Sequence, residues 1–350
     1  MLENPLIARG NARPGADLGA WRSAALRLED EINATILGQR EAVRLLNVAV
    51  FGRGHVLLEG DVGVGKTTLL RCVARLIGGG YERVEGSIDL MPSDLIYRTY
   101  VDEQGKPRVA PGPLLKHGAG LSTFFFNEVN RARPQMHSLL LRVMAERSVT
   151  AFDREYRFPH LQVYADRNRV EKEETFEIPA AARDRFLLEL EIKAPADPEL
   201  QRQLMFDTRF HDVDLLLERL PQGLVAYEQL NDVAAEVQNH VQATATLQGY
   251  AVDLCRATSA PADFDVRISD VDIGQFIQAG ASPRGMSQLV QAARVAAWLA
   301  GRDAVTPEDI HEVFFAAIGH RIFLKPVYEL RRSELVGEFL GQVLNRVAAP

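Results

Sequence analysis

The segment HVLLEGDVGVGKTTLLRCVA, residues 55–74, constrains the fold more than any other part of the chain. It fits the pattern G-x-x-x-x-G-K-[ST], with an apolar run typical of a strand before it and an amphipathic helical pattern after it. Glycines allow a tight turn that aims backbone N–H groups at phosphate oxygens, and the start of the following helix adds its dipole. Strand, turn and helix occur in the order that the motif requires, so the segment predicts nucleotide binding. The predicted phosphate cradle consists of Gly60, Asp61, Val62, Gly63, Val64, Gly65, Lys66, Thr67 and Thr68.

Two side chains of this segment have chemical roles in a P-loop. Lys66 is expected to reach the β and γ phosphates of ATP, and the Thr67 hydroxyl is expected to bind Mg²⁺. The alternative is a glycine-rich turn with a chance lysine, which the agreement of strand, loop and helix disfavours.

Short apolar runs separated by helical patterns predict the rest of the fold. The runs at residues 55–58, 82–85, 123–126, 161–165 and 186–191 are typical of strands. Strands that alternate with helices predict a parallel sheet, and hence an α/β P-loop NTPase core.

The pattern of apolar and polar residues changes after KAPADPEL, residues 193–200. Helical periodicity dominates from there to the end, with breaks at prolines. We therefore expect a flexible arm over residues 1–20, rich in Gly, Pro, Asn and Ala, an α/β nucleotide-binding domain over residues 21–195, and an all-helical domain over residues 196–350.

Composition limits the classes of function. The 350 residues are 47% hydrophobic and 25% charged, with a formal net charge of -7, as in an ordinary globular protein. The acidic balance argues against nucleic-acid binding, and no apolar run is long enough for membrane insertion. The two cysteines, Cys72 and Cys255, suit a reducing compartment, and we expect a cytoplasmic location.

Further motifs arrive in a recognisable order along the chain. ILGQ (36–39) precedes the P-loop, and FFFNEVN (124–130), YADRNR (164–169), RDRF (183–186) and GASPRG (280–285) follow it. In this order the chain resembles the AAA+ ATPases, and more closely the MoxR family, from about residue 30 to residue 320. The segments DLMPSDL, PGPLL, NRARPQMHSLLLRVMAERSVT and AGRDAVTPEDI add to the resemblance.

The resemblance implies a role for individual residues. Gly38 and Gln39 would lie beside the adenine, and Glu128 would activate the attacking water from the exit of the strand next to the P-loop strand. Asn168 would hydrogen-bond the water or the γ-phosphate as the first sensor. The alternatives are a solvated loop glutamate at 128 and a turn-forming asparagine at 168.

The resemblance also implies two arginines that act on the nucleotide. Arg185 would reach the nucleotide of the adjacent subunit of a ring as an arginine finger. Arg284, in the helical domain, would be the second sensor at the γ-phosphate. A salt bridge between Arg185 and Asp184 and a surface position for Arg284 are the alternatives.

The chain departs from the family at the exit of the FFF strand. Relatives have Asp-Glu where this chain has Asn127-Glu128, and Asn127 keeps an oxygen ligand for Mg²⁺ but loses the charge. Val62 replaces a proline, and Asp166-Arg167 replaces Thr-Gln before the sensor asparagine. Asp166 exits a strand that would neighbour the Asn127 strand, so it is a candidate to restore the negative charge near the metal. The lost charge should weaken hydrolysis but should not abolish it, because Glu128, Lys66, Thr67, Asn168 and both arginines remain. We therefore expect a slow ATPase.

The resemblance implies an ATP-driven protein that remodels or matures a client enzyme. Metal or cofactor insertion, a von Willebrand factor A domain partner, a hexameric ring and a methanol dehydrogenase as client are what the family would suggest. Alternatives are a nucleotide-gated scaffold with little hydrolysis, a DNA-acting motor and a small-molecule kinase.

Two further patterns remain outside the nucleotide site. TYVDEQGKPRV, residues 99–109, predicts a β-hairpin, which in the family would contact clients or would be an ordinary surface hairpin. Leu335, Val336, Phe339, Leu340, Val343, Leu344 and Val347 form one helical stripe, which we expect to pack on the helical domain or on a partner.

Overall fold

The computed structural model describes residues 17–168 and 175–350. Most of the predicted arm, residues 1–16, lies outside the described residues. Helix α1 (Leu18–Thr35) begins before the predicted end of the arm, because the carboxylate of Asp17 accepts hydrogen bonds from the backbone N–H groups of Gly19 and Ala20.

A parallel sheet of five strands forms the centre of the molecule in the order β2-β5-β8-β1-β9. The strands are β1 (His55–Glu59), β2 (Gly80–Glu85), β5 (Leu121–Asn127), β8 (Gln162–Arg167) and β9 (Phe186–Glu191). All five predicted strands and the parallel α/β sheet are confirmed. One expectation is wrong: the strand that ends at Asn127 is not next to the P-loop strand, because β8 lies between β5 and β1.

The two faces of the sheet are covered by different helices. Helices α1, α2 (Arg40–Phe51) and α3 (Lys66–Ile77) pack on one face, and α5 (Pro134–Glu146) packs on the other. All seven residues of β5 are buried, and alternation along the strand sends Phe125 to one core cluster and Phe124 and Phe126 to the other. A strand that is covered on both faces has a continuous run of apolar residues, which explains the three consecutive phenylalanines at 124–126.

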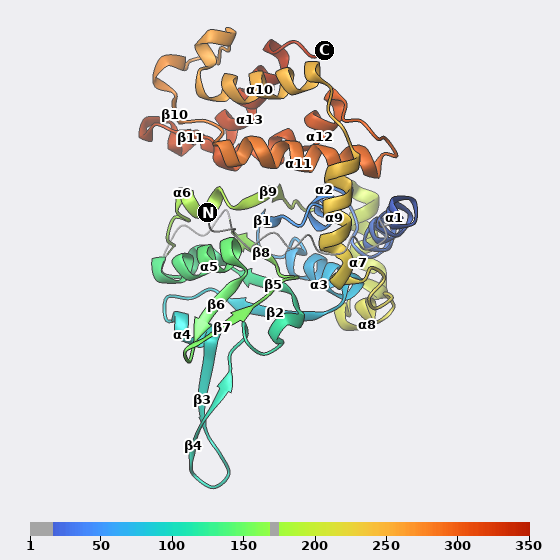
Figure 1. The fold of residues 1–350 in the computed structure, drawn as a ribbon, viewed down its shortest axis with the longest axis vertical. Coiled ribbons are helices and arrows are strands. Elements are labelled where there is room, and N and C mark those ends of the chain that lie inside the picture. The colour runs from blue at the N-terminus through green and yellow to red at the C-terminus, as the bar shows by residue number, and fades with distance from the viewer. Residues whose placement is uncertain (1–16, 169–174) are drawn as a thin grey trace, which may run out of the picture.

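Short elements connect the strands on the side of α5. They are α4 (Pro92–Ile96), β3 (Tyr97–Val101), β4 (Pro107–Pro111), β6 (Ser148–Ala151), β7 (Arg154–Arg157) and α6 (Ala180–Arg183). The antiparallel pair β3–β4 is the predicted hairpin, and it projects away from the body of the molecule (Figure 1). A second antiparallel pair joins β6 and β7.

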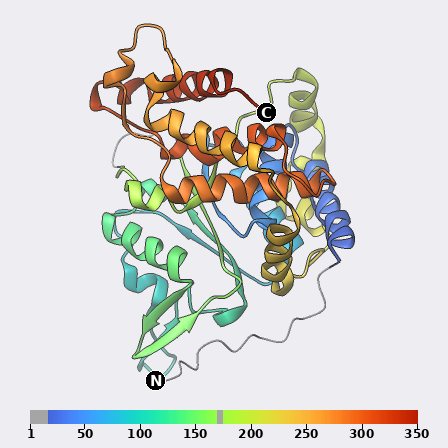
Figure 2. The same cartoon turned by 45° about the horizontal axis from the view of Figure 1, so that its top comes forward.

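The chain after β9 is helical apart from one short ribbon. Its helices are α7 (Pro198–Phe206), α8 (Val213–Glu218), α9 (Leu230–His240), α10 (Ala245–Ser259), α11 (Pro283–Leu299), α12 (Pro307–Ile318) and α13 (Arg332–Arg346). Strands β10 (Ile277–Ala279) and β11 (Phe323–Leu324) form the ribbon. Helices α10–α13 make a layer beyond the sheet, in which α11 contacts α2 and α12 contacts β9; α8 contacts α3, and α9 contacts α1 and α2 (Figures 1 and 2). The predicted boundary near residue 195 therefore follows β9, but the first helices after it pack on the α/β domain.

The C-terminal stripe packs on the chain's own helices. Leu335, Phe339, Leu340 and Val343 of α13 are buried, and α13 contacts α10 and α12. Both cysteines are free thiols in the core. None of the helices in the described ranges is both long and apolar enough to cross a membrane.

Candidate functional site

The phosphate-binding loop runs from the end of β1 to the start of α3. Gly63 and Gly65 have φ angles of +80° and +91°, which glycine adopts without strain. A Cβ on Gly60 would lie 2.3 Å from the carbonyl oxygen of Ile192, so no larger residue fits there. Gly65 is the N-cap of α3 and has no side chain to satisfy the first N–H groups of the helix. The loop thus has the backbone geometry of a phosphate cradle, and residues 60–68 fit a nucleotide.

Lys66 is buried and has polar partners on two strands. Its Nζ donates to the carbonyl oxygen of Gly60 at 2.6 Å and to Oδ1 of Asn168 at 2.6 Å. It also lies 3.4 Å from the Oδ2 carboxylate oxygen of Asp166. Asp166 and Asn168, at the C-terminal end of β8, therefore both contact the P-loop lysine.

Glu128 stands directly after β5 with a left-handed backbone, φ +52°. Its Oε1 accepts a hydrogen bond from Nδ2 of Asn168 at 3.2 Å, and its Oε2 pairs with Nη1 of Arg131 at 3.0 Å. Its backbone N–H donates to Oδ1 of Asp166 at 2.5 Å. The structure therefore brings the predicted Lys66, Glu128 and Asn168 together.

Asp166 lies within this group with almost no solvent exposure. Burial raises the pKa of its carboxyl group, while the hydrogen bond from the Glu128 N–H and the charge of Lys66 lower it. The prediction that the strand of Asp166 neighbours the strand of Asn127 is confirmed, since β5 and β8 are paired.

Asn127 is buried at the end of β5 and faces β2. Its Nδ2 donates to Oε1 of Glu85, the residue opposite it in the β2–β5 pairing. The oxygens of Thr67, Asn127 and Asp166 are a hydroxyl, an amide and a carboxylate, which are the hard donors that Mg²⁺ prefers. Within the described residues no group of three or more His, Cys, Asp or Glu side chains could hold a metal by itself. This donor set fits a Mg²⁺ ion that keeps its waters and binds chiefly through phosphate.

A cavity of about 600 Å³ adjoins the predicted adenine residues. Gly38 and Gln39 line it from the core, and His311 and Phe315 of α12 line it from the helical layer. Gly38 has φ +75°, and a Cβ there would lie 2.8 Å from Cγ of Pro195. This volume is in the range of small-molecule sites, and the cavity lies between the α/β domain and the helical layer α10–α13, called the lid from here on. The contributions of His311 and Phe315 were not predicted from the sequence.

The two predicted arginines lie on either side of Asp184. Arg284 pairs with Asp184, with Nη1 3.3 Å from Oδ2, whereas Arg185 donates to the carbonyl oxygen of Ala181 at 2.9 Å. Burial and the neighbouring charge of Arg284 lower the pKa of Arg185. In the described part of this single chain neither arginine is bonded to Lys66, Glu128 or Asn168, so the structure does not join them to the P-loop group.

Sequence reasoning named Asp184 only as an alternative partner of Arg185 and missed its contacts with the helical region. Asp184 accepts hydrogen bonds from the Ser282 hydroxyl at 2.6 Å and from Nε of the buried Arg321 at 3.1 Å. Arg321 also donates to the carbonyl oxygen of Phe186 at 2.5 Å, so it joins the lid to β9. No local pattern signals a contact between positions 137 residues apart.

Family models match both parts of the fold. The model described as the ATPase family associated with various cellular activities (AAA) covers residues 55–188, and an AAA lid domain model covers residues 272–338. The first spans the sheet from β1 to β9, and the second runs from residue 272 into the first half of α13.

Relatives align over nearly the whole chain. The chain is 56% identical to Protein MoxR of Methylorubrum extorquens, over 97% of this chain and 99% of the relative. It is 51% identical to Protein MoxR of Paracoccus denitrificans, over 96% and 99%. It is 32% identical to Chaperone MoxR1 of Mycobacterium tuberculosis, over 91% and 81%.

A solved structure has the same architecture. A candidate ATPase from Cytophaga hutchinsonii superposes with a TM-score of 0.81 at 28% identity, over 95% of this chain and 97% of that one. The P-loop, the parallel sheet, the lid and the near-complete alignment agree, and the chain belongs to the MoxR family of AAA+ ATPases.

Proposed function

We propose that the chain hydrolyses ATP at the group formed by Lys66, Glu128 and Asn168. The observation that carries this proposal is the linked set of bonds from Lys66 to Asn168 and from Asn168 to Glu128, which unites the P-loop with a carboxylate. In this reading Lys66 leaves Asn168 for the β and γ phosphates, and Glu128 accepts the proton of the attacking water. Asn168 then holds the water or the γ-phosphate.

The remaining predicted residues complete the site. The N–H groups of residues 60–68 hold the phosphates, and the adenine occupies the cavity beside Gly38 and Gln39. Thr67 and Asn127 hold Mg²⁺, which when bound neutralises charge on the phosphates. Arg185 acts on the nucleotide of a neighbouring subunit, and Arg284 couples the lid to the nucleotide state.

Hydrolysis is proposed to be slow because Asn127 has no charge where the family has aspartate. A charge pair about 4 Å apart at an effective dielectric of 20 is worth roughly 4 kcal/mol. A loss of only about 1.4 kcal/mol of transition-state stabilisation slows turnover tenfold. Asn127 also supports the second candidate, a nucleotide-gated scaffold that binds ATP and assembles with little turnover.

The biological role is proposed from the family. ATP-dependent assembly into a homo-oligomeric ring, of six subunits, would place Arg185 at a subunit boundary. One relative is named Chaperone MoxR1, and a chaperone-like role in maturing a client enzyme, by metal or cofactor insertion, is proposed for this chain, together with a cytoplasmic location. A von Willebrand factor A domain protein is the proposed partner, and methanol dehydrogenase is a candidate client.

The β3–β4 hairpin is the proposed contact with the client. It extends from the molecule and exposes Tyr100, Val101 and Val109, which have 52%, 69% and 59% of their surface accessible (Figure 1). Large apolar side chains on a projecting element suit binding to another protein. Client capture by variants with Tyr100→Ser and Val109→Ser should be lost while ATP turnover remains.

Steady-state phosphate release with Mg-ATP, measured across protein concentrations, tests the activity. Turnover should rise with assembly and disappear in Glu128→Gln, which keeps the size of the side chain and removes the carboxylate. The charge-conserving pair Asn127→Asp/Glu85→Gln should raise turnover, because the carboxylate moves to position 127 without a second one beside it. ATP binding without phosphate release by the natural chain would favour the scaffold.

A further inference from the structure

Asp166 places a carboxylate between the P-loop lysine and the backbone of Glu128. Its strand, β8, lies between β1 and β5, so residue 166 approaches the site from the middle of the sheet. The side chain is 1% exposed, with Oδ2 3.4 Å from Lys66 Nζ and Oδ1 2.5 Å from the N–H of Glu128. A buried carboxylate needs a cation or several donors, and Lys66 is the cation that the structure supplies.

Nucleotide binding changes this balance of charge. Lys66 must turn toward the phosphates to act in a P-loop, and Asp166 then keeps its hydrogen bond from the backbone N–H of Glu128. A buried carboxylate that loses its counter-ion is unfavourable unless another cation replaces it. Mg²⁺ accompanies ATP at a P-loop, and a nearby carboxylate can accept hydrogen bonds from the water molecules bound to the metal.

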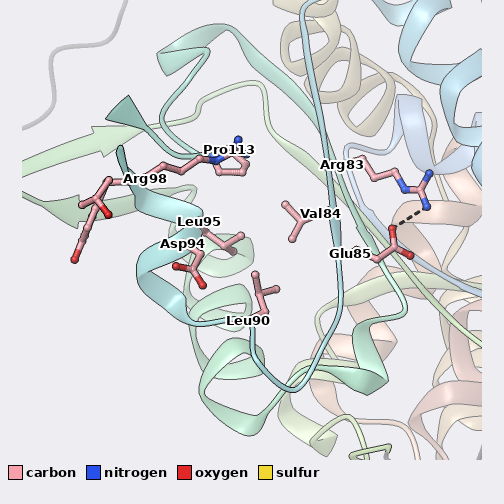
Figure 3. A pocket seen from close by; sticks show the side chains of 10 residues that line it. Arg83, Val84, Glu85, Leu90, Asp94, Leu95, Arg98 and Pro113 are labelled. Atoms are coloured by element: carbon pink, nitrogen blue, oxygen red, sulfur yellow. Dashed lines mark hydrogen bonds and ion pairs between the residues drawn. The ribbon is translucent and has the colours of Figure 1, made fainter. Parts of the chain in front are cut away.

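The surroundings of Asn127 explain why the charge is not there. Asn127 donates its Nδ2 hydrogen to Glu85, so an aspartate at position 127 would place two carboxylates side by side. Glu85 itself is not a substitute, because its side chain is 53% exposed and pairs with Nη2 of Arg83 at 2.8 Å. Figure 3 shows this pair at a cavity of about 500 Å³ which Val84 and α4 also line.

We propose that Asp166, from β8, supplies the negative charge for Mg²⁺ that position 127 lacks, and that Lys66 is its counter-ion when no nucleotide is bound. The inference rests on the proposed nucleotide site and adds a residue to it. Asp166 is then a positioning residue that supports the binding of Mg²⁺ through the waters of the metal. Because it does not occupy position 127, it does not restore the transition-state stabilisation of an aspartate there, and the slow turnover proposed above is retained.

The test measures affinity for a fluorescent ATP analogue in EDTA and across Mg²⁺ concentrations, without reference to turnover. The magnesium gain is the affinity at saturating Mg²⁺ divided by the affinity in EDTA. Asp166→Asn should lower this gain about tenfold or more, since tenfold corresponds to about 1.4 kcal/mol and a charge near a metal contributes at least that much. The triple variant Asn127→Asp/Asp166→Asn/Glu85→Gln, in which the carboxylate at position 127 has no second carboxylate beside it, should regain most of it.

Matched controls separate the alternatives. Glu85→Gln removes a nearby carboxylate that is paired with Arg83, and it should change the gain less than about twofold. Asn127→Asp adds a second carboxylate to the proposed metal site, and its gain should rise by less than tenfold, because Asp166 already supplies one charge; this variant tests the idea even if Asp166→Asn does not fold.

The outcomes distinguish the two proposals. An Asp166→Asn protein that melts like the natural chain and keeps the full gain would overturn the role of Asp166, as would a tenfold larger gain in Asn127→Asp. An equal loss in Glu85→Gln would assign the charge to Glu85 instead. A natural chain that binds no nucleotide in either condition would overturn the nucleotide site itself.

Discussion

Asp184 is expected to hold the lid on the α/β domain, and the substitution Asp184→Asn tests this. The residue precedes β9, whereas its partners Ser282, Arg284 and Arg321 belong to the helical region. Asparagine keeps the size of the side chain and an acceptor for the Ser282 hydroxyl. The substitution removes the negative charge and replaces one acceptor oxygen by an NH2 donor, so the bond from Arg284 to Oδ2 is lost if the amide oxygen stays with Ser282 and Arg321.

The magnitude follows from the burial of the partners. Arg321 is 1% exposed, and burial lowers its pKa to about 10, so it remains charged at neutral pH. Removing one member of a buried ion pair costs about 3–5 kcal/mol, and the bond from Arg321 to the Phe186 carbonyl places the expected loss near about 3 kcal/mol. The pair with Arg284 adds at most about 1 kcal/mol, because that side chain is 47% exposed.

Urea unfolding followed by tryptophan fluorescence is the appropriate measurement. Trp298 of the lid and Trp21 of α1 both pack on Phe51, with ring centroids 5.2 Å and 6.5 Å away, so both tryptophans of the chain report on the junction. Arg284→Gln is the matched control, since it removes the exposed partner of the same carboxylate. Equal destabilisation by Asp184→Asn and Arg284→Gln would refute the reasoning that burial sets the strength of this pair.

Three further predictions concern stability. Burial lowers the pKa of His55 to about 3, and the nearby charges of Arg147 and Arg53 lower it further, although the hydrogen bond to the Met144 carbonyl raises it. An unfolded histidine titrates near about 6.5, so this contribution is complete above that pH and is lost as the pH falls toward 3; urea titrations should show about 2 kcal/mol less stability from this residue at pH 5 than at pH 7, and His55→Gln should reduce that dependence. Phe125→Ala, at a fully buried position of β5, should cost about 3–5 kcal/mol in the same assay, whereas Tyr100→Ala on the exposed hairpin should cost less than about 0.5 kcal/mol. Lys66→Met leaves Asp166 without its counter-ion and should destabilise the nucleotide-free protein by about 2 kcal/mol. Burial raises the pKa of Asp166, so the loss should shrink as the pH falls and the carboxylate takes up a proton; a loss that does not change with pH would contradict the pairing.

Local patterns were sufficient for the elements of the fold. The continuous FFF run indicated a strand buried on both faces, and the P-loop motif required a strand, a turn and a helix in sequence. The Gln-Gly turn between short runs predicted the β3–β4 hairpin. These signals depend on neighbours a few positions away, so the sequence carries them directly.

The sequence by itself determined that a nucleotide cradle, a carboxylate at residue 128 and a neutral Asn127 exist in this chain. Only the tertiary structure decided that β8 separates β5 from β1, which puts Asp166 beside Lys66 and Asn127 beside Glu85. Strand order is set by the packing of whole helices on the sheet, and charge pairing follows from it. Contacts between distant positions therefore depend on the complete fold, and no local pattern of residues encodes them.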